Sequence, residues 1–363
     1  MGPGPSDVSA RVLGALSRPT IGHLDPAFIG LMDETKRLLQ YAFNTQNALT
    51  MPLSAPGSAG MEAMFVNLLE PGDKVVICVN GVFGARMKEN ALRVGAVVVT
   101  VDDPWGEQSK PDKVERALEQ HSDAIALAFV HAETSTGVRN DAKTLCDIAK
   151  RHGCLTIVDA VTALAGIELR VDDWQIDAIY SGTQKCLSCV PGLAPISFSD
   201  KAIERIKSRR HPVQSWFLDM NLIVGYWGDG ANKEGQKRAY HHTAPVNSVY
   251  ALHESLVILH EEGLANSWAR HADMHQSLKS GLDKLGLEMA VDEAYRLPQL
   301  NVVKIPRGVN DAQVRAQLLD QFGLEIGAGL GELAGKVWRI GLMGHGSNQK
   351  NIDYCIDSLS RVL

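Results

Sequence analysis

The sequence predicts an α/β protein with a mostly parallel sheet between helices, followed by a smaller α+β unit. Short apolar or β-branched runs alternate with segments of helical periodicity along the first two thirds of the chain, a pattern typical of a parallel sheet buried on both faces. After about residue 260 the order of elements changes. The length of 363 residues also exceeds what one simple core usually holds, so two packed regions are expected.

The first 259 residues are predicted to form an arm and a large domain. Residues 1–25 are rich in glycine and proline and are expected to be an N-terminal arm rather than packed secondary structure. The large domain is expected over residues 26–259. Its predicted strands are Lys74–Val79, Ala96–Val101, Ala124–Val130, Leu155–Val158 and Ala178–Ser181. Its predicted helices are Leu31–Phe43, Met61–Leu69, Val82–Val94, Asp112–Gln120 and Ala142–His152.

Residues 260–363 are predicted to form a small C-terminal α+β domain that packs on the first. Its expected helices are Ala265–Leu285, Asp311–Phe322 and Gln349–Val362, and its expected strands are Gln299–Ile305 and Val337–Leu342. No internal repeat is visible.

Composition and charge exclude several classes of protein. A net charge of −6 and a pI near 6.1 argue against a nucleic-acid or membrane-surface binder, which would need a basic face. The opening segment has neither the basic start nor the apolar stretch of a signal peptide, so a cytoplasmic location is expected.

The sequence predicts no metal site. Cys186 and Cys189 lack the second cysteine pair that would complete a zinc site, and all six cysteines are expected to be reduced thiols. His271 and His275 have i, i+4 spacing, but no third ligand lies nearby in the sequence. A solvated helix face is the expectation for both.

Asp159 ends the buried strand that begins at Leu155. Ligands of α/β proteins bind at the carboxyl ends of parallel strands. A carboxylate buried there without a partner would be costly, so a positively charged or protonated nitrogen is expected beside it, and a pyridinium ring would serve. The alternative is an aspartate that caps the following turn.

Lys185 follows the next predicted strand, at the end of a small polar turn, Ser181–Lys185. A lysine at the mouth of a buried site can lose hydration and become nucleophilic, as Schiff-base chemistry requires. An exposed loop lysine is the alternative. Asp159 lies one strand–helix step earlier in the chain, and both residues are expected at the same edge of the sheet. This shared position favours the catalytic interpretation of Lys185.

Three further segments carry candidate binding groups. Ser54–Gly60 places small residues at a helix start, where free backbone N–H groups can bind an anion. Arg339 lies in an apolar strand, and its guanidinium fork suits a carboxylate, although a structural ion pair is the alternative. Tyr240–Thr243 is a dense polar cluster near the domain boundary.

Taken together and in order, these segments resemble the class V aminotransferases, most of all the alanine–glyoxylate and serine–pyruvate aminotransferase family. The segments that carry the resemblance are Gly2–Ser6, Leu69–Asp73, Asn80–Gly84, His131–Gly137, Ile157–Asp159, Ser181–Lys185, Tyr240–Thr243 and Gly335–Gly341. They span nearly the whole chain, and the ordered set is far more specific than any one segment.

The resemblance implies the transferase fold type I with a seven-stranded type of sheet, pyridoxal 5′-phosphate as cofactor, and defined roles for the residues. Lys185 would hold the cofactor as a Schiff base, and Asp159 would keep its pyridine nitrogen protonated. Arg339 would bind the substrate carboxylate.

The resemblance also implies residues that hold the cofactor in place. Val161 and Phe83 would pack on the two ring faces, and Ser135 would lie near the ring hydroxyl. Gly57, Ser58 and Gln184 would hold the phosphate.

The same resemblance implies a homodimer with shared sites, because Tyr240 and Thr243 would reach the phosphate of the neighbouring subunit. The phosphate segment departs from the family pattern. Pro56 and Ser58 stand where a serine and a histidine are often found, and Phe83 stands where tryptophan is frequent. One hydroxyl, one imidazole and one backbone donor are therefore missing.

The implied reaction is a ping-pong transfer of an amino group from a small amino acid, alanine or serine, to glyoxylate or pyruvate. A similar alternative is (S)-ureidoglycine–glyoxylate aminotransferase. In those enzymes asparagine tends to precede His-His-Thr and glutamine follows the early glycine, whereas this chain has Tyr240 and His23. A non-catalytic or NAD-binding α/β protein is the remaining alternative, although no GxGxxG turn follows the first strand.

Overall fold

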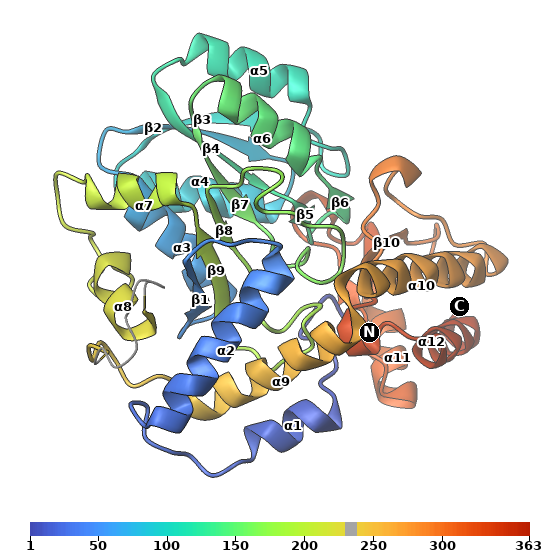
Figure 1. Cartoon of the computed structure of the whole chain (residues 1–363). Coiled ribbons are helices and arrows are strands. Elements are labelled where there is room, and N and C mark those ends of the chain that lie inside the picture. Colours follow the sequence, from blue (N-terminus) through green and yellow to red (C-terminus); the bar gives the residue numbers. More distant parts are fainter. Residues whose placement is uncertain (229–237) are drawn as a thin grey trace.

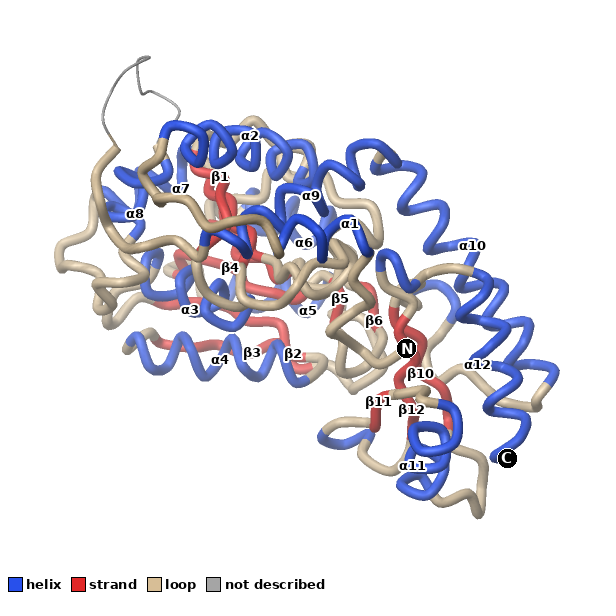
Figure 2. Tube along the Cα trace, turned by 90° about the horizontal axis from the view of Figure 1, so that it is seen from below, coloured by secondary structure: helices blue, strands red, loops and turns tan. Residues whose placement is uncertain are grey.

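The computed structural model describes residues 1–228 and 238–363. Figure 1 shows a large unit, in which helices surround a central sheet, and a smaller unit formed by the C-terminal part of the chain. Seen from below, the helices lie on both faces of the large sheet (Figure 2).

Seven strands form the large sheet in the order β1-β9-β8-β7-β4-β2-β3. The strands are β1 (Leu49–Leu53), β2 (Lys74–Val79), β3 (Val97–Asp102), β4 (Ala124–Val130), β7 (Leu155–Asp159), β8 (Ala178–Tyr180) and β9 (Ala194–Phe198). Only β9 is antiparallel to its neighbours β1 and β8. The prediction of a mostly parallel, seven-stranded sheet is confirmed.

The sequence predicted five of these strands and missed β1 and β9. Both missed strands contain proline, which lacks the N–H that a sheet requires and weakens a strand prediction. Pro52 and Pro195 lie opposite each other in the β1–β9 ladder. Since β1 is the edge strand, the missing donors are confined to one border of the sheet.

Helices of the large unit flank this sheet and its edges. They are α1 (Ala10–Leu16), α2 (Pro26–Phe43), α3 (Gly57–Leu68), α4 (Val82–Val94), α5 (Pro111–Gln120), α6 (Ala142–Arg151), α7 (Asp200–Lys207), α8 (Met220–Trp227) and α9 (Val246–Glu262). A two-stranded hairpin, β5 (Ala132–Glu133) and β6 (Val138–Arg139), follows β4.

The first 25 residues contain a helix, where their composition predicted none. Ser9 caps α1 by accepting a hydrogen bond from Val12 N at 3.4 Å. Val12 and Ala15 are buried, and α1 packs against α9. Residues Ala10–Leu16 therefore form a helix because they pack against α9, which is distant in the sequence, as is usual for short helices.

The small unit contains a three-stranded antiparallel sheet in the order β10-β12-β11. Its elements are α10 (Leu264–Lys284), β10 (Leu300–Lys304), α11 (Asp311–Phe322), β11 (Gly327–Ala328), β12 (Val337–Gly341) and α12 (Gln349–Val362). The five elements that the sequence predicted here all form. A separate hydrophobic core, which includes Leu282, Trp338 and Leu359, holds the unit together.

The prediction of a solvated helix face for His271 and His275 was wrong. Both side chains are buried, at 0% and 5% exposure. His271 Nδ1 bonds the Ser267 carbonyl at 2.7 Å, and Gly344 N donates to His271 Nε2 at 3.0 Å, which ties α10 to the segment after β12. Burial lowers the pKa of His271 to about 4, so it serves as a neutral hydrogen-bonding core residue.

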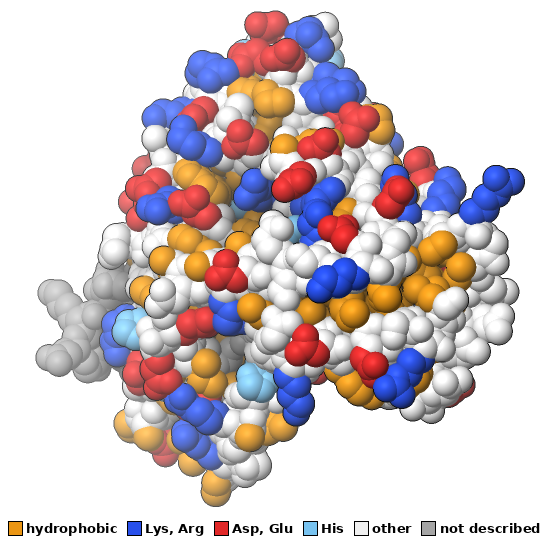
Figure 3. All heavy atoms as spheres, turned by 90° about the vertical axis from the view of Figure 1, so that its right-hand side faces the viewer, with side chains coloured by type: hydrophobic (Ala, Val, Ile, Leu, Met, Phe, Trp, Pro, Cys, Tyr) orange, Lys and Arg blue, Asp and Glu red, His pale blue; other side chains and the backbone are white. Residues whose placement is uncertain are grey.

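The surface is of mixed charge on the face that Figure 3 shows, where basic and acidic side chains are interspersed. Among the described residues, no helix combines the length and apolarity needed to cross a bilayer.

Candidate active site

The carboxyl ends of β7 and β8 form the centre of the candidate site. The two strands are parallel neighbours, and Asp159 at the end of β7 pairs in register with Tyr180 at the end of β8. Lys185 lies in the turn that follows β8. Adjacent parallel strands end at the same edge of a sheet, so the structure brings Asp159 and Lys185 to one place.

Asp159 is buried and held by two hydrogen-bond donors. Its side chain is 2% exposed. Tyr180 Oη donates to Oδ2 at 2.6 Å, and Val161 N donates to Oδ1 at 2.8 Å. Burial raises the pKa of Asp159 to about 6, while the two donors act in the opposite direction. The donors therefore keep the carboxylate ionised near neutral pH in spite of its burial.

Tyr180 is a candidate site residue that the sequence interpretation missed, and it is identified by its hydrogen bond to Asp159. It is fully buried, and burial raises the pKa of its phenol well above the ordinary value, so it remains a donor. Its position opposite Asp159 depends on the register between two strands, which the sequence does not fix. A polar aromatic residue at the end of a buried strand was the available signal.

Lys185 is mostly buried at the mouth of the same strand ends. Burial lowers the pKa of its ammonium to about 8; the charge of Arg339 lowers it further, and that of Asp159 opposes the change. The ammonium donates a hydrogen bond to the carbonyl of Pro3 in the N-terminal segment. A lysine in this environment gives up its proton more readily than a solvated one.

Arg339 extends from β12 of the small unit toward these residues. It is 7% exposed, its Nε donates to Ala328 O at 2.8 Å, and its Nη1 donates to Thr134 O at 3.3 Å. It forms no ion pair with a carboxylate in the part of the chain that the structure describes, so the alternative of a structural ion pair finds no support. A buried guanidinium with carbonyl partners alone is well suited to bind an anion.

The amino end of α3 packs directly under the strand ends. Gly57 is buried, and a β-carbon there would lie 3.3 Å from both the Ser181 carbonyl and the Val161 side chain. Pro56 precedes the helix and provides no side-chain cap. The first backbone N–H groups of α3 are thus available beside Val161 and the Ser181–Lys185 turn.

Two side chains near α3 complete this part of the site. Ser58 is exposed and accepts a hydrogen bond from Arg86 Nη1 at 3.3 Å. The Oε1 atom of Gln184 is buried and has no hydrogen-bond partner among the described residues. Such an atom normally has a partner, so a ligand or water is expected to bind it.

Phe83 and Arg86 lie one turn apart on α4. Phe83 is half-buried, and the guanidinium carbon of Arg86 lies 5.0 Å from the centre of its ring. Arg86 forms no ion pair within the described ranges, and its charge acts on Asp159. The sequence interpretation missed Arg86, although its i+3 spacing from Phe83 could have pointed to it.

Ser135 participates in a buried cap at the start of α4. Its hydroxyl donates to Glu133 Oε1 at 2.5 Å and accepts from Val82 N at 3.0 Å. Glu133 also accepts from Phe83 N at 3.2 Å. The Ser135 hydroxyl is therefore engaged, and a contact with the ring hydroxyl of a cofactor would compete with these bonds.

Tyr240 and Thr243 lie on the surface. Tyr240 is 63% exposed, and its ring centre lies 5.3 Å from that of His23. Between the two residues, His242 Nε2 hydrogen bonds Ser54 Oγ at 2.7 Å, in the segment that leads to α3. The segment is thus anchored near α3, while Tyr240 and Thr243 themselves face outward.

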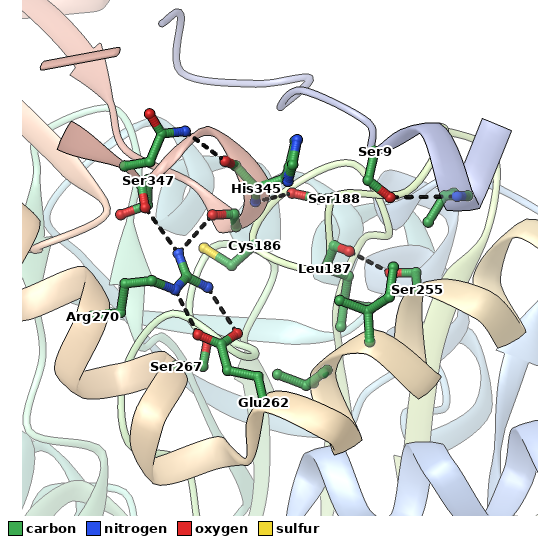
Figure 4. A pocket seen from close by; sticks show the side chains of 15 residues that line it. Ser9, Cys186, Leu187, Ser188, Ser255, Glu262, Ser267, Arg270, His345 and Ser347 are labelled. Atoms are coloured by element: carbon green, nitrogen blue, oxygen red, sulfur yellow. Dashed lines mark hydrogen bonds and ion pairs between the residues drawn. The ribbon is translucent and has the colours of Figure 1, made fainter. Parts of the chain in front are cut away.

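A cavity of about 360 Å³ lies behind the Lys185 turn, between α1, α9, α10 and the segment after β12 (Figure 4). Cys186, Ser188 and Arg270 line it, but Lys185 and Asp159 do not. Arg270 pairs with Glu262 and donates to the Gly344 and Ser347 carbonyls. Burial raises the pKa of Cys186 to about 12, which makes it a poor nucleophile. The cavity is separate from the strand-end site.

A mostly buried lysine and a buried carboxylate at adjacent strand ends, with uncapped backbone amides of a helix start beside them, are the arrangement expected of a fold type I pyridoxal-phosphate enzyme. The family model for class-V aminotransferases matches residues 7–347. The chain belongs to the aminotransferase class-V family, and its cofactor is pyridoxal 5′-phosphate.

Individual relatives agree with this assignment over the full length. The chain is 40% identical over 364 residues to alanine–glyoxylate aminotransferase of Rattus norvegicus. The matched region covers 100% of this chain and 87% of the relative. The chain is 36% identical over 381 residues to (S)-ureidoglycine–glyoxylate transaminase of Bacillus subtilis (strain 168), with coverage of 100% and 90%.

A solved structure of alanine–glyoxylate aminotransferase from Nostoc sp. has a TM-score of 0.96 and 46% identity, and covers 100% of this chain and 94% of its own. The alternative of a non-catalytic or NAD-binding protein is thereby set aside.

The described residues fit this cofactor. Asp159 accepts hydrogen bonds from two donors, but no cationic group of the described residues lies at hydrogen-bonding distance from it. A pyridinium nitrogen would supply that cationic partner. The free amides at the start of α3 can donate to a phosphate, whereas the unpartnered Gln184 Oε1 is an acceptor, so Gln184 would have to contact a phosphate through its Nε2. No group of three or more potential metal ligands occurs in the ranges described.

Proposed function

We propose that this protein transfers the amino group of a small amino acid, alanine or serine, to glyoxylate or pyruvate in a ping-pong cycle. The observation that carries the proposal is the placement of Lys185 and Asp159 at neighbouring strand ends, with the unpaired Arg339 directed toward them. Full-length similarity to alanine–glyoxylate aminotransferases supports the choice of substrates.

Each residue has a role that follows from its surroundings. When bound, pyridoxal phosphate supplies a ring that accepts the electrons released at the amino-acid Cα. Asp159 would hold a proton at the ring nitrogen, and Tyr180 would keep Asp159 ionised and oriented. Lys185 would hold the cofactor through Nζ and, once released, move a proton between the substrate Cα and the cofactor C4′. Arg339 would bind the substrate α-carboxylate.

The cofactor's pyridine ring and its phosphate would be held by the remaining predicted residues. Val161 and Phe83 would pack on the two ring faces, with Ser135 near the ring hydroxyl. Gly57, Ser58 and Gln184 would contact the phosphate. Arg86 would add positive charge through Ser58, at the place where the family pattern often has a histidine. A basic side chain is then retained in the phosphate site, though it comes from α4 instead of α3.

A homodimer would complete the site. Tyr240 and Thr243 are exposed in the single chain, as required of side chains that contact the phosphate of a partner subunit. Their anchor, the bond between His242 and Ser54, couples the segment to the start of the phosphate-binding region.

One feature favours a small apolar or hydroxylated donor over (S)-ureidoglycine. Arg339 does not distinguish them, because alanine, serine and ureidoglycine each carry a single carboxylate. The residues that stand in place of the amides of ureidoglycine enzymes, His23 and Tyr240, lie together in the structure and form an aromatic pair. Such a pair offers fewer hydrogen bonds to a ureido group than two amides would.

The test is a set of half-reactions followed by the absorbance of the bound cofactor. Purified protein is mixed with alanine, serine or (S)-ureidoglycine, and the conversion of the cofactor from its aldehyde to its amine form is timed. Fastest conversion by alanine or serine supports the proposal. Fastest conversion by ureidoglycine would instead assign the protein to ureidoglycine transamination, and conversion by none of them would contradict both substrate proposals.

A further inference from the structure

The first six residues connect the small unit to the lysine turn. Gly341 N, at the end of β12, donates to Met1 O at 2.8 Å. Pro3 packs on β11 so closely that a β-carbon on Gly327 would lie 2.7 Å from its Cδ. In both Figure 1 and Figure 2 the N-terminus lies beside the small sheet, where it faces the large unit.

The other end of this segment is bound to the backbone of the turn that carries Lys185. Ser6 N donates to Gln184 O at 2.8 Å, and Ser6 Oγ donates to Lys185 O at 2.6 Å. The segment is therefore held on both sides of the site by hydrogen bonds to the two units.

The lysine side chain lies along the middle of this segment. The Lys185 ammonium donates to the Pro3 carbonyl. A β-carbon on Gly4 would lie 2.5 Å from Lys185 Nζ, 2.8 Å from Cδ and 3.0 Å from Cε. Gly4 also has φ +106°, a region that favours glycine. Only a residue without a side chain leaves room for the lysine here.

The identity of the acceptor matters for the chemistry of the amine. A carboxylate at this position would bind the ammonium strongly and hold its proton, which would suppress the nucleophilic form. A backbone carbonyl fixes the nitrogen through a hydrogen bond but carries no net charge. It can therefore orient a desolvated amine and still allow it to lose a proton.

We propose that residues Pro3–Ser6 are a positioning element for Lys185, in which the Pro3 carbonyl holds the free amine and Gly4 provides the space for the lysine chain. The inference rests on the proposed function only for the role of Lys185 as the cofactor-binding lysine. It assigns a task to a segment that the proposed mechanism does not otherwise use.

The decisive variant is Gly4→Ala, studied in the protein stripped of cofactor. The added methyl group would displace the lysine chain from the Pro3 carbonyl. Lys185 should then react about ten-fold faster with formaldehyde and cyanoborohydride, as measured by peptide mass spectrometry, because an oriented charged hydrogen bond is lost. Recapture of added pyridoxal phosphate, followed by the absorbance of the bound cofactor, should slow by a similar factor.

Two glycine substitutions are matched controls. Gly2→Ala lies in the same segment, but its β-carbon would meet only Glu325 at an ordinary 3.6 Å. Gly72→Ala imposes the same kind of backbone strain, at φ +89°, with no neighbour within 4 Å. Both should leave the reactivity of Lys185 and the rate of cofactor capture unchanged.

Ser6→Ala tests the same role without steric conflict and replaces Gly4→Ala if that variant does not fold. It removes the bond to Lys185 O, and should raise the reactivity of Lys185 by about three-fold. Wild-type reactivity and wild-type cofactor capture in the folded Gly4→Ala or Ser6→Ala variant would overturn the inference. Lysine labelling needs no turnover, so a protein that accepts none of the proposed amino donors would still give a clear result.

Discussion

The strand-end region around Asp159 and the segment Tyr240–Thr243 both belong to the proposed site, yet they are built in opposite ways. Asp159 and Tyr180 are buried, their bond is 2.6 Å, and the register of β7 with β8 fixes it. Tyr240 is 63% exposed, and the contacts of its segment are a ring pair and the bond from His242 to Ser54.

This difference in burial indicates that the strand-end residues serve the chemistry, whereas the exposed segment Tyr240–Thr243 serves binding. Burial changes the proton affinities of Asp159 and Lys185, and a sheet can hold such groups at fixed distance without water. A surface segment has little effect on proton affinity, but it can reach another molecule. We therefore expect substitutions at the strand ends to reduce turnover, and substitutions in residues 240–243 to weaken cofactor binding and assembly.

The largest effect is expected for Lys185→Ala. Loss of the amine that moves the proton should lower kcat at least about 10⁴-fold, while pyridoxal phosphate still binds noncovalently. Turnover is measured with alanine and glyoxylate, and bound cofactor by absorbance after gel filtration. Lys207→Ala, on the exposed end of α7, is the matched control and should be fully active. Substantial turnover by Lys185→Ala would mean that another group moves the proton.

Asp159→Asn should lower kcat by about 10² to 10³-fold with little change in folding stability. A neutral amide cannot hold the ring proton, so the ring becomes a poorer electron acceptor. Tyr180→Phe, which leaves the carboxylate but removes one donor, should cost less and raise the pKa of Asp159. The pH dependence of kcat is the measurement. Full activity of Asp159→Asn would reduce Asp159 to a residue that caps the turn.

The amine of Lys185 should titrate far below an ordinary lysine in protein without cofactor. Burial disfavours the charged form, so the neutral amine should appear with a midpoint near pH 8. At neutral pH this gives about 10²-fold more neutral amine than in a free lysine of pKa about 10.4. The rate of reductive methylation at Lys185 as a function of pH gives the midpoint.

The same shift has a consequence for stability. Between pH 8 and the higher value of the unfolded chain, the unfolded state binds more protons, so this group adds stability as the pH rises through that window. The same protein in urea is the control, in which the labelling midpoint should return to about 10.4. An equal midpoint in folded and unfolded protein would contradict the burial of this amine.

Arg339→Ala should raise the KM for the amino acid by about 10- to 100-fold, because a charge-assisted bond to the carboxylate is lost. Arg339→Lys keeps the charge but not the fork, and should recover only part of the loss. Arg315→Ala, on α11 of the same small unit, is the control. A KM that does not change in Arg339→Ala would place the carboxylate anchor elsewhere.

The smallest effect is expected for Thr243→Ala, a loss of about 3- to 10-fold in affinity for pyridoxal phosphate with kcat nearly unchanged at saturation. Equilibrium dialysis gives the affinity, and sedimentation gives the oligomeric state. Thr100→Ala in β3 is a control far along the sheet order from β8. If Thr243→Ala lowers kcat as strongly as Asp159→Asn does, the separation of chemistry from binding fails.

The periodicity and order of the motifs were sufficient for the fold class, since apolar runs that alternate with amphipathic helices have few ways to bury their apolar surface. The same patterns located α4, α11 and α12 to the residue. They also singled out Asp159 and Arg339, because charged residues within apolar strands are rare, and Lys185, because it follows the next strand at the same edge of the sheet.

Elements whose stability comes from partners distant in the sequence could not be predicted. Helix α1 forms because α9 covers it, and β1 and β9 pair despite their prolines. The burial of His271 depends on the segment after β12, and the contact of Tyr180 with Asp159 depends on the register of two strands. In each case, the partner that determines the structure of the residue or element lies far from it in the sequence.

The sequence by itself therefore determined which residue types are available for the chemistry and the kind of sheet that holds them. The tertiary structure alone decided their proton affinities and their neighbours: the tyrosine that supports Asp159, the arginine above Phe83, and the Pro3 carbonyl at Lys185. The physical reason is that hydrophobic periodicity is a local property of the chain, whereas burial and hydrogen bonding depend on which distant segments pack together.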